Sequence, residues 1–155
     1  MDTTFHTDKG VFNYRAAAVW IIDGHILLHR QADDSYWALP GGRVMMGEDS
    51  KTSLIREMKE ELGVEVQVER MLWLTENFFN YRGMPFHEIG LYYFVSCPAL
   101  PPIWRKGPFH GLEGERLVYQ WVSLHELSSM TVYPSFLQET LGNIPKTTEH
   151  IIVHS

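Results

Sequence analysis

Three glutamates lie within one short segment of the chain, REMKEELGV (residues 56–64). Glu57 and Glu61 are four residues apart, and like charges at that spacing destabilise a helix by about 0.2–0.5 kcal/mol per pair. At 100° per residue, Glu57, Glu60 and Glu61 fall within an arc of about 100° on a helix. Such a cluster needs either solvent around every carboxylate or a cation that offsets the repulsion.

The residue types indicate which cation that would be. Carboxylate oxygens without nitrogen or sulfur ligands favour Mg²⁺ or Mn²⁺ over zinc. A hard cation held in this way binds substrate phosphates and polarises a phosphoryl oxygen, and a remaining glutamate can accept the proton of an attacking water. The cluster therefore indicates hydrolysis of a phosphoanhydride. The alternative is an acidic helix face exposed to solvent, which is the commoner explanation of an isolated E-x-x-E-E pattern.

Residues around the cluster extend the pattern. Arg56 lies four residues before Glu60 and flanks the carboxylates, and Glu48 in the preceding loop can close over the same spot. The bend predicted at Gly41-Gly42 can expose a backbone carbonyl oxygen as a further ligand. Four apolar residues fill the adjacent arc of the helix and are predicted to face the core: Leu54, Ile55, Met58 and Leu62.

The stretch from Gly42 to Val64 resembles the Nudix hydrolase signature at every specified position. Its fixed residues are Gly42, Glu48, Arg56, Glu57, Glu60, Glu61 and Gly63. The resemblance implies one α+β domain over residues 1–155, built as an α/β/α sandwich with a mixed central sheet. It also implies cleavage of a nucleoside diphosphate linked to another group, with Mg²⁺ or Mn²⁺ as cofactor.

The resemblance assigns roles residue by residue. It makes Glu57, Glu60 and Glu61 the main metal ligands, with the Gly42 carbonyl as a further one. Glu57 would also orient or activate water, Arg56 would hold a glutamate in place, and Glu48 would be a secondary ligand or a proton-handling group.

Many Nudix enzymes use another acidic residue outside this signature, at a position that varies between subfamilies. Glu115, six residues before Trp121, is the first candidate, and Glu113 and Glu88 are the alternatives. Each of the three is also explicable as an ordinary surface or strand-end charge.

Substrate contacts are predicted outside the signature. Phe79 and Tyr81 can stack on a base, while Arg82 and Arg30 can meet phosphates, although core packing explains a phenylalanine equally well. ADP-ribose or a nucleotide sugar is the first expectation, and a dinucleoside polyphosphate or nucleoside triphosphate comes next. Trp104 and Phe109 lie in a long Pro- and Gly-rich segment, residues 101–114, which is either a lid, a passive insertion or a dimer contact.

Composition narrows the class of partner. The chain of 155 residues carries 13 basic and 19 acidic residues, a formal net charge of −6, which argues against binding a nucleic-acid backbone or an anionic membrane. The single cysteine, Cys97, permits neither an internal disulfide nor a cysteine-based zinc site. No signal or membrane-span pattern is present, so a cytoplasmic protein with a small nucleotide substrate is expected. A homodimer is left open, and a catalytically weak nucleotide-binding sensor is the alternative function.

The elements that must position these residues follow from hydrophobic patterning. Strands are expected at residues 14–22, 25–29, 64–76, 88–95 and 117–122, with a short one at 37–40. Helices are expected from Asp49 or Ser50 to Gly63, after a capping box at residues 123–126, and at 134–141. The tail after residue 141 has no clear pattern.

Overall fold

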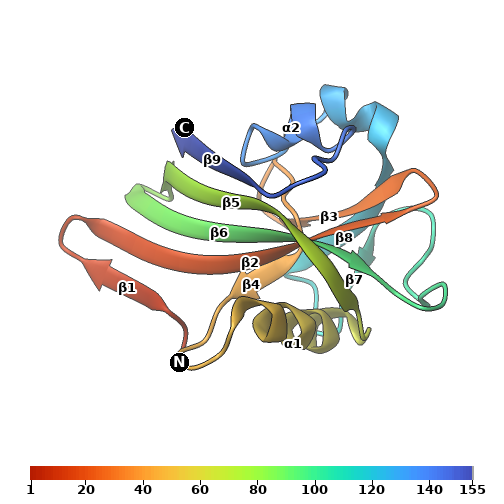
Figure 1. Cartoon of the computed structure of the whole chain (residues 1–155), viewed down its shortest axis with the longest axis horizontal. Helices are drawn as coiled ribbons and strands as arrows, with labels where there is room; N and C mark the ends of the chain where they lie inside the picture. The colour runs from red at the N-terminus through yellow and green to blue at the C-terminus, as the bar shows by residue number, and fades with distance from the viewer. Residues whose placement is uncertain (155) are drawn as a thin grey trace.

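A branched mixed sheet organises the chain in the computed structural model, which describes residues 1–154 (Figure 1). Within these residues the strands are β1 (Thr4–Thr7), β2 (Gly10–Ile22), β3 (His25–Gln31), β4 (Gly41–Arg43), β5 (Gln67–Tyr81), β6 (Met84–Ser96), β7 (Phe109–His110), β8 (Leu117–Ser123) and β9 (Glu149–His154). The helices are α1 (Ser50–Leu62), the 3-10 helix η1 (Leu124–Ser129) and α2 (Leu137–Thr140). The strand order is β7-β8-β3-β2-β6-β5-β9, with β1 and β4 both paired to β2.

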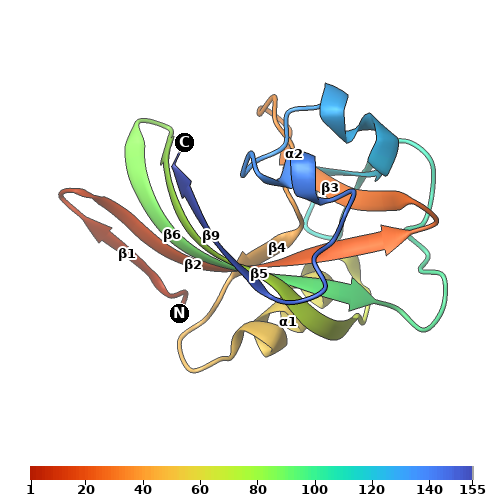
Figure 2. The same cartoon turned by 45° about the horizontal axis from the view of Figure 1, so that its top comes forward.

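The sheet divides along β2. This strand pairs in parallel with β6 from Val11 to Trp20, but with β3 only through Ile21 and Ile22. Further back along β2, the antiparallel strand β4 pairs with it instead, opposite residues 15–17. The strands β3 and β8 therefore diverge from the larger group formed by β2, β6, β5 and β9, as Figure 2 shows. This divergence opens the space in which the pocket described below lies.

Helices cover both faces of the sheet. Ala16, Ala18 and Trp20 of β2 pack in the cluster that includes Leu54 and Met58 of α1. Ala17 and Val19, on the opposite face of the same strand, pack in the cluster that includes residues of η1 and α2. A strand buried on both faces reads as a continuous apolar run. The predicted α+β class and the layered sandwich with a mixed sheet are confirmed.

The helix that carries the glutamates begins and ends where the sequence predicts. The Asp49 side chain accepts a hydrogen bond from the Thr52 amide at 2.9 Å, which caps the first turn. Gly63 has φ of 69°, the left-handed conformation that ends many helices. One prediction for this helix is wrong: Ile55 is 38% exposed, because α1 contacts the sheet through a stripe that its side chain does not reach.

Several other element boundaries differ from expectation. Gly41 and Gly42 lie in β4 rather than in a flexible bend that ends a 37–40 strand. β5 begins at Gln67 and continues to Tyr81, since β6 pairs with it along almost all of that length. At the predicted capping box, the Ser123 side chain accepts a hydrogen bond from the His125 amide, and the helix that it caps is a 3-10 helix.

The tail contains a strand that the sequence does not predict. β9 pairs in parallel with β5 from Glu149 to His154. The helix expected at residues 134–141 covers only Leu137–Thr140. Among residues 1–154, no helix is long and apolar enough to cross a membrane.

Candidate active site

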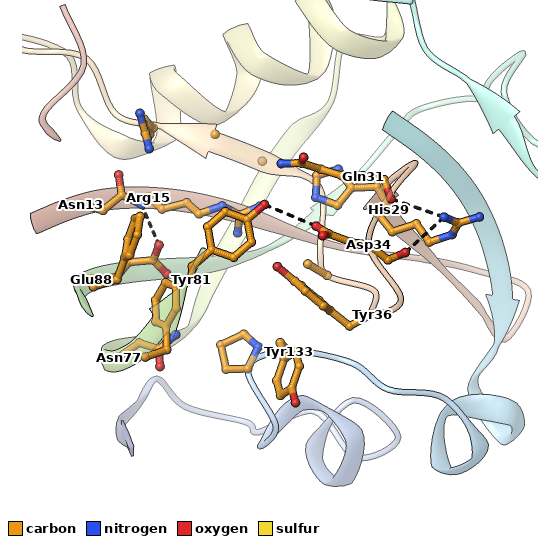
Figure 3. Close-up of a pocket in the computed structure, with 18 of the residues that line it drawn as sticks. Asn13, Arg15, His29, Gln31, Asp34, Tyr36, Asn77, Tyr81, Glu88 and Tyr133 are labelled. Carbon is orange, nitrogen blue, oxygen red and sulfur yellow. Dashed lines mark hydrogen bonds between the residues drawn. The ribbon is translucent and has the colours of Figure 1, made fainter. Parts of the chain in front are cut away.

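A pocket of about 890 Å³ occupies the space where β2 and β3 diverge (Figure 3). On one side lie Asn13, Arg15, Asn77 and Glu88, from β2, β5 and β6. Across from them lie His29 and Gln31 of β3. Glu57 and Glu61 of α1, together with Gly41 and Gly42 of β4, also line the pocket. Two of the predicted metal ligands, Glu57 and Glu61, therefore line the same cavity as the polar side chains of β2, β5 and β6, which form its deep wall.

Gly42 lies directly against the carboxylate of Glu57. A Cβ atom placed at Gly42 would be 2.6 Å from Glu57 Oε2 and 2.7 Å from Oε1. Only glycine leaves room for this carboxylate in its observed position. The backbone of β4 and the side chain of Glu57 consequently form adjacent walls of the site.

Burial makes the charge on the pocket glutamates costly. Glu61 is only 6% exposed, and burial, followed by the nearby negative charge of Glu57, raises its pKa to about 7. The Tyr119 hydroxyl donates to Glu61 Oε2 at 3.1 Å. Burial also raises the pKa of Glu57, against the opposing effect of Arg56.

Arg56 joins the remaining acidic residues of the signature. Its guanidinium donates to Glu48 at 3.0 Å and to both Glu57 and Glu60 at 3.1 Å. Hydrogen bonding from Arg56 holds the pKa of Glu48 below its usual range. Glu60 is on the exposed side, with 53% of its side chain accessible, and it does not line the pocket. The structure thus brings Glu57 and Glu61 to the pocket and keeps Glu48 and Glu60 at its edge.

The pocket glutamates fit a magnesium ion by their chemistry. Among residues 1–154, no three His, Cys, Asp or Glu side chains converge into a ready-made metal site. Mg²⁺ does not need such a cage, because it usually takes one or two carboxylates and keeps several waters. Glu61 supplies a buried carboxylate and Glu57 a half-buried one. Their negative charges repel each other, and a cation between them would relieve that repulsion.

The acidic residue outside the signature is not where it was first expected. Glu115 is exposed and does not line the pocket, so the geometry gives that prediction no support. Glu113 is also exposed, yet its charge contributes to raising the pKa of both Glu57 and Glu61. Glu88 is buried and lines the pocket.

Three of the four predicted substrate residues line the pocket: Arg30, Phe79 and Tyr81. Arg82 does not. It sits at the β5–β6 turn, where it pairs with Asp33 at 3.2 Å and Asp34 at 3.7 Å. No residue of the 101–114 segment lines the pocket. Phe109 is buried against Tyr119, and Trp104 packs on Trp121.

Sequence reasoning missed several residues of the deep wall. Asn13, Arg15, His29, Tyr36, Asn77 and Tyr133 all line the pocket. A signal existed for one of them: Arg15 interrupts an otherwise apolar run, and a charge within a buried strand requires a partner. The others carry no local pattern that separates them from ordinary strand residues.

His29 predicts a pH dependence of stability. Burial, and then the positive charges of Arg15 and Arg116, lower its pKa to about 3. The unfolded chain would bind a proton at His29 below pH 6.5 while the folded chain would not, so the free energy of unfolding falls as pH drops from 6.5 towards 3. Between pH 6.5 and 4.5 this loss is about 2–3 kcal/mol. Urea unfolding of the wild type and His29→Gln at both pH values measures it.

The matched control is His125→Gln, because the His125 side chain is exposed. We expect His29→Gln to lose less stability than the wild type on acidification and His125→Gln to lose as much. Equal losses in all three proteins would contradict the assignment of a neutral, buried imidazole.

Comparison with known proteins identifies the class to which this fold and pocket belong. The NUDIX domain model matches residues 13–140, most of the chain. The chain therefore belongs to the NUDIX family, as the signature indicates.

Individual relatives share parts of the chain. It is 38% identical over 55 residues to a MutT-like protein of Streptomyces ambofaciens, which is 36% of this chain and 36% of that protein. It is 30% identical over 116 residues to an 8-oxo-dGTP diphosphatase of Buchnera aphidicola subsp. Schizaphis graminum (strain Sg), which is 75% of this chain and 68% of that protein. The crystal structure of a MutT protein from Methanosarcina mazei Go1 shares the fold, with a TM-score of 0.61 and 22% identity over 88% of this chain and 94% of that one.

Proposed function

We propose that this protein is a divalent-metal-dependent hydrolase that cleaves the phosphoanhydride of a nucleoside diphosphate linked to another group. The observation that carries the proposal is the pairing of Glu57 and Glu61 with glycine backbone at one end of a pocket large enough for a nucleotide. ADP-ribose or a nucleotide sugar is the first substrate class to test. Nucleoside triphosphates follow, since one relative is named as an 8-oxo-dGTP diphosphatase.

Glu57, Glu61 and the Gly42 carbonyl would hold the cation, with Glu60 as a further ligand from the pocket edge. A bound Mg²⁺ or Mn²⁺ would polarise a phosphoryl oxygen of the substrate. Water attacks one phosphorus, the bond to the bridging oxygen breaks, and the leaving phosphate keeps the electron pair. Glu57 accepts the proton of the attacking water.

The other residues position these groups. Arg56 holds Glu48, Glu57 and Glu60 through charge-assisted hydrogen bonds. Arg30 lines the pocket and offers guanidinium donors to substrate phosphates. Glu113, whose charge acts on Glu57 and Glu61, is the better candidate than Glu115 for the acidic residue outside the signature.

The test is release of product from ADP-ribose, nucleotide sugars, dinucleoside polyphosphates and nucleoside triphosphates in Mg²⁺, Mn²⁺ or EDTA. We expect turnover of one class with metal and none with EDTA. Tight nucleotide binding without turnover of any compound would instead favour the nucleotide sensor.

A further inference from the structure

A buried polar cluster at the deep wall of the pocket has no part in the proposed chemistry. Glu88 is 6% exposed, and its Oε2 accepts a hydrogen bond from the Asn13 amide at 2.7 Å. Asn13 Oδ1 in turn accepts from the Thr4 hydroxyl at 3.0 Å, which fixes the orientation of the amide. A buried carboxylate is costly unless it serves a purpose, and this one lines a cavity wide enough for a ligand.

The pocket leaves buried hydrogen-bonding atoms without partners. Among residues 1–154, three buried side-chain atoms lack a partner, and two of them, His29 Nδ1 and Asn77 Oδ1, belong to residues lining this pocket. An ionised carboxylate offers about four acceptor sites, and on Glu88 the Asn13 amide occupies one of them. Burial raises the pKa of Glu88, so N–H donors from a ligand would stabilise its charged form. Free acceptors on both Glu88 and Asn77 call for a ligand that presents N–H donors.

The position of Glu88 suits the base of a nucleotide. In the sheet, Glu88 pairs with Asn13, and Gly42 pairs with Ala16 of the same strand. Glu88 and the backbone that contacts Glu57 are therefore offset by three residues along β2, about 10 Å, and by two strand spacings across it, also about 10 Å, because β6 and β4 lie on opposite edges of β2. An extended nucleoside diphosphate, with its base, ribose and two phosphates, spans a comparable length. Aromatic rings for stacking line the same pocket, at Tyr36, Phe79, Phe86, Tyr81 and Tyr133.

Arg15 sets the order of donors and acceptors. Arg15 lines the pocket on the same side as Glu88 (Figure 3), and its guanidinium donates to the Leu39 carbonyl oxygen at 2.7 Å. Its positive charge opposes the rise in the pKa of Glu88. A cationic donor beside a carboxylate matches an edge that carries a carbonyl next to adjacent N–H groups. Guanine has this edge, with O6 followed by N1–H and the N2 amino group. Adenine and cytosine place a ring-nitrogen acceptor beside their amino group, and uracil has a single N–H.

We propose that Glu88, with Asn13 and Asn77, is the specificity-determining group for the substrate's base, and that it selects guanine. The inference rests on the proposed function, because it assigns the base half of that substrate. If the Glu88 carboxylate accepted hydrogen bonds from N1–H and the N2 amino group of guanine, its free acceptor sites would be occupied. A base that presents a ring-nitrogen acceptor would place its lone pair against the Glu88 carboxylate. Two acceptors repel each other, so the site would bind such a base more weakly.

The test is calorimetric binding of GMP, AMP, CMP and UMP to the full chain in Mg²⁺. We expect the wild type to bind GMP at least about 10-fold more tightly than the other three, since only guanine would place two N–H donors on the Glu88 carboxylate. Glu88→Gln should bind GMP about 10- to 100-fold more weakly and lose the preference. The matched control is Glu76→Gln. Glu76 is partly exposed, pairs with His150 and does not line the pocket, so all four affinities should be unchanged.

The outcomes separate this inference from the proposed function. The wild-type panel does not depend on any variant folding, and a preference for another base, or none, would overturn the inference. Retention of GMP preference by a folded Glu88→Gln would overturn it as well. Metal-dependent hydrolysis without base preference would leave the proposed function standing alone. A GMP preference that Glu88→Gln removes, in a protein that hydrolyses no nucleotide, would support the guanine site and overturn the hydrolase.

Discussion

Glu57→Gln is expected to reduce kcat/KM by about 100- to 10,000-fold, the range associated with losing a group that accepts a proton in the transition state. The substitution removes the charge that would hold a cation and accept the proton of water, yet it keeps the shape of the side chain. Burial already disfavours the charged form of Glu57, so the neutral amide should change the free energy of unfolding by less than about 1 kcal/mol. Steady-state kinetics and urea unfolding measure the two effects separately.

The matched control for this substitution is Glu65→Gln. Glu65 lies just after α1, where its exposed carboxylate pairs with Lys59 at 3.1 Å. Exposed pairs contribute little, so both activity and stability should remain at the wild-type level. Undiminished turnover in Glu57→Gln would show that Glu57 is not the group that handles the proton. Loss of activity in Glu65→Gln would point to a general effect of helix charge.

Gly42→Ala should reduce kcat/KM by about 100-fold without unfolding the protein. The new Cβ would lie 2.4 Å from the carboxyl carbon of Glu57, so the Glu57 side chain must move out of its place. A displacement of about 1 Å at a reacting group can cost that factor in rate. The end of the Glu57 side chain can rotate, and alanine is preferred over glycine in a strand by roughly 0.5–1 kcal/mol, so stability should hold.

Gly142→Ala is the control for this second substitution. A Cβ at Gly142 meets no atom within 4 Å, so the variant tests the chemical change alone. We expect a raised metal requirement in Gly42→Ala, measured as the Mg²⁺ concentration for half-maximal rate, and no change in Gly142→Ala. Wild-type kinetics in Gly42→Ala would mean that the position of the Glu57 carboxylate is unimportant for turnover.

The metal end of the pocket was predictable from local pattern because a single helix carries most of it. Arg56, Glu57 and Glu61 reach their places through helical spacing alone, and the helix ends are set by neighbours in sequence, at Asp49 and Gly63. A motif that spans one loop and one helix needs no distant contact to define which residues stand together. The layered architecture followed equally, from apolar runs that can be buried on both faces.

The deep wall and the tail depended on contacts between distant segments. Glu88 meets Asn13 across 75 positions of sequence, and β9 becomes a strand because it pairs with the free edge of β5. Whether Glu115 or Glu113 approaches the glutamates depends on how the loop before β8 folds. His29 and Glu88 become buried only when β2, β3 and β6 assemble around the pocket. That burial keeps His29 neutral and makes Glu88 a candidate for contacting the base. Hydrophobic and hydrogen-bond patterning acts over a few residues, whereas strand pairing and burial are properties of the assembled chain.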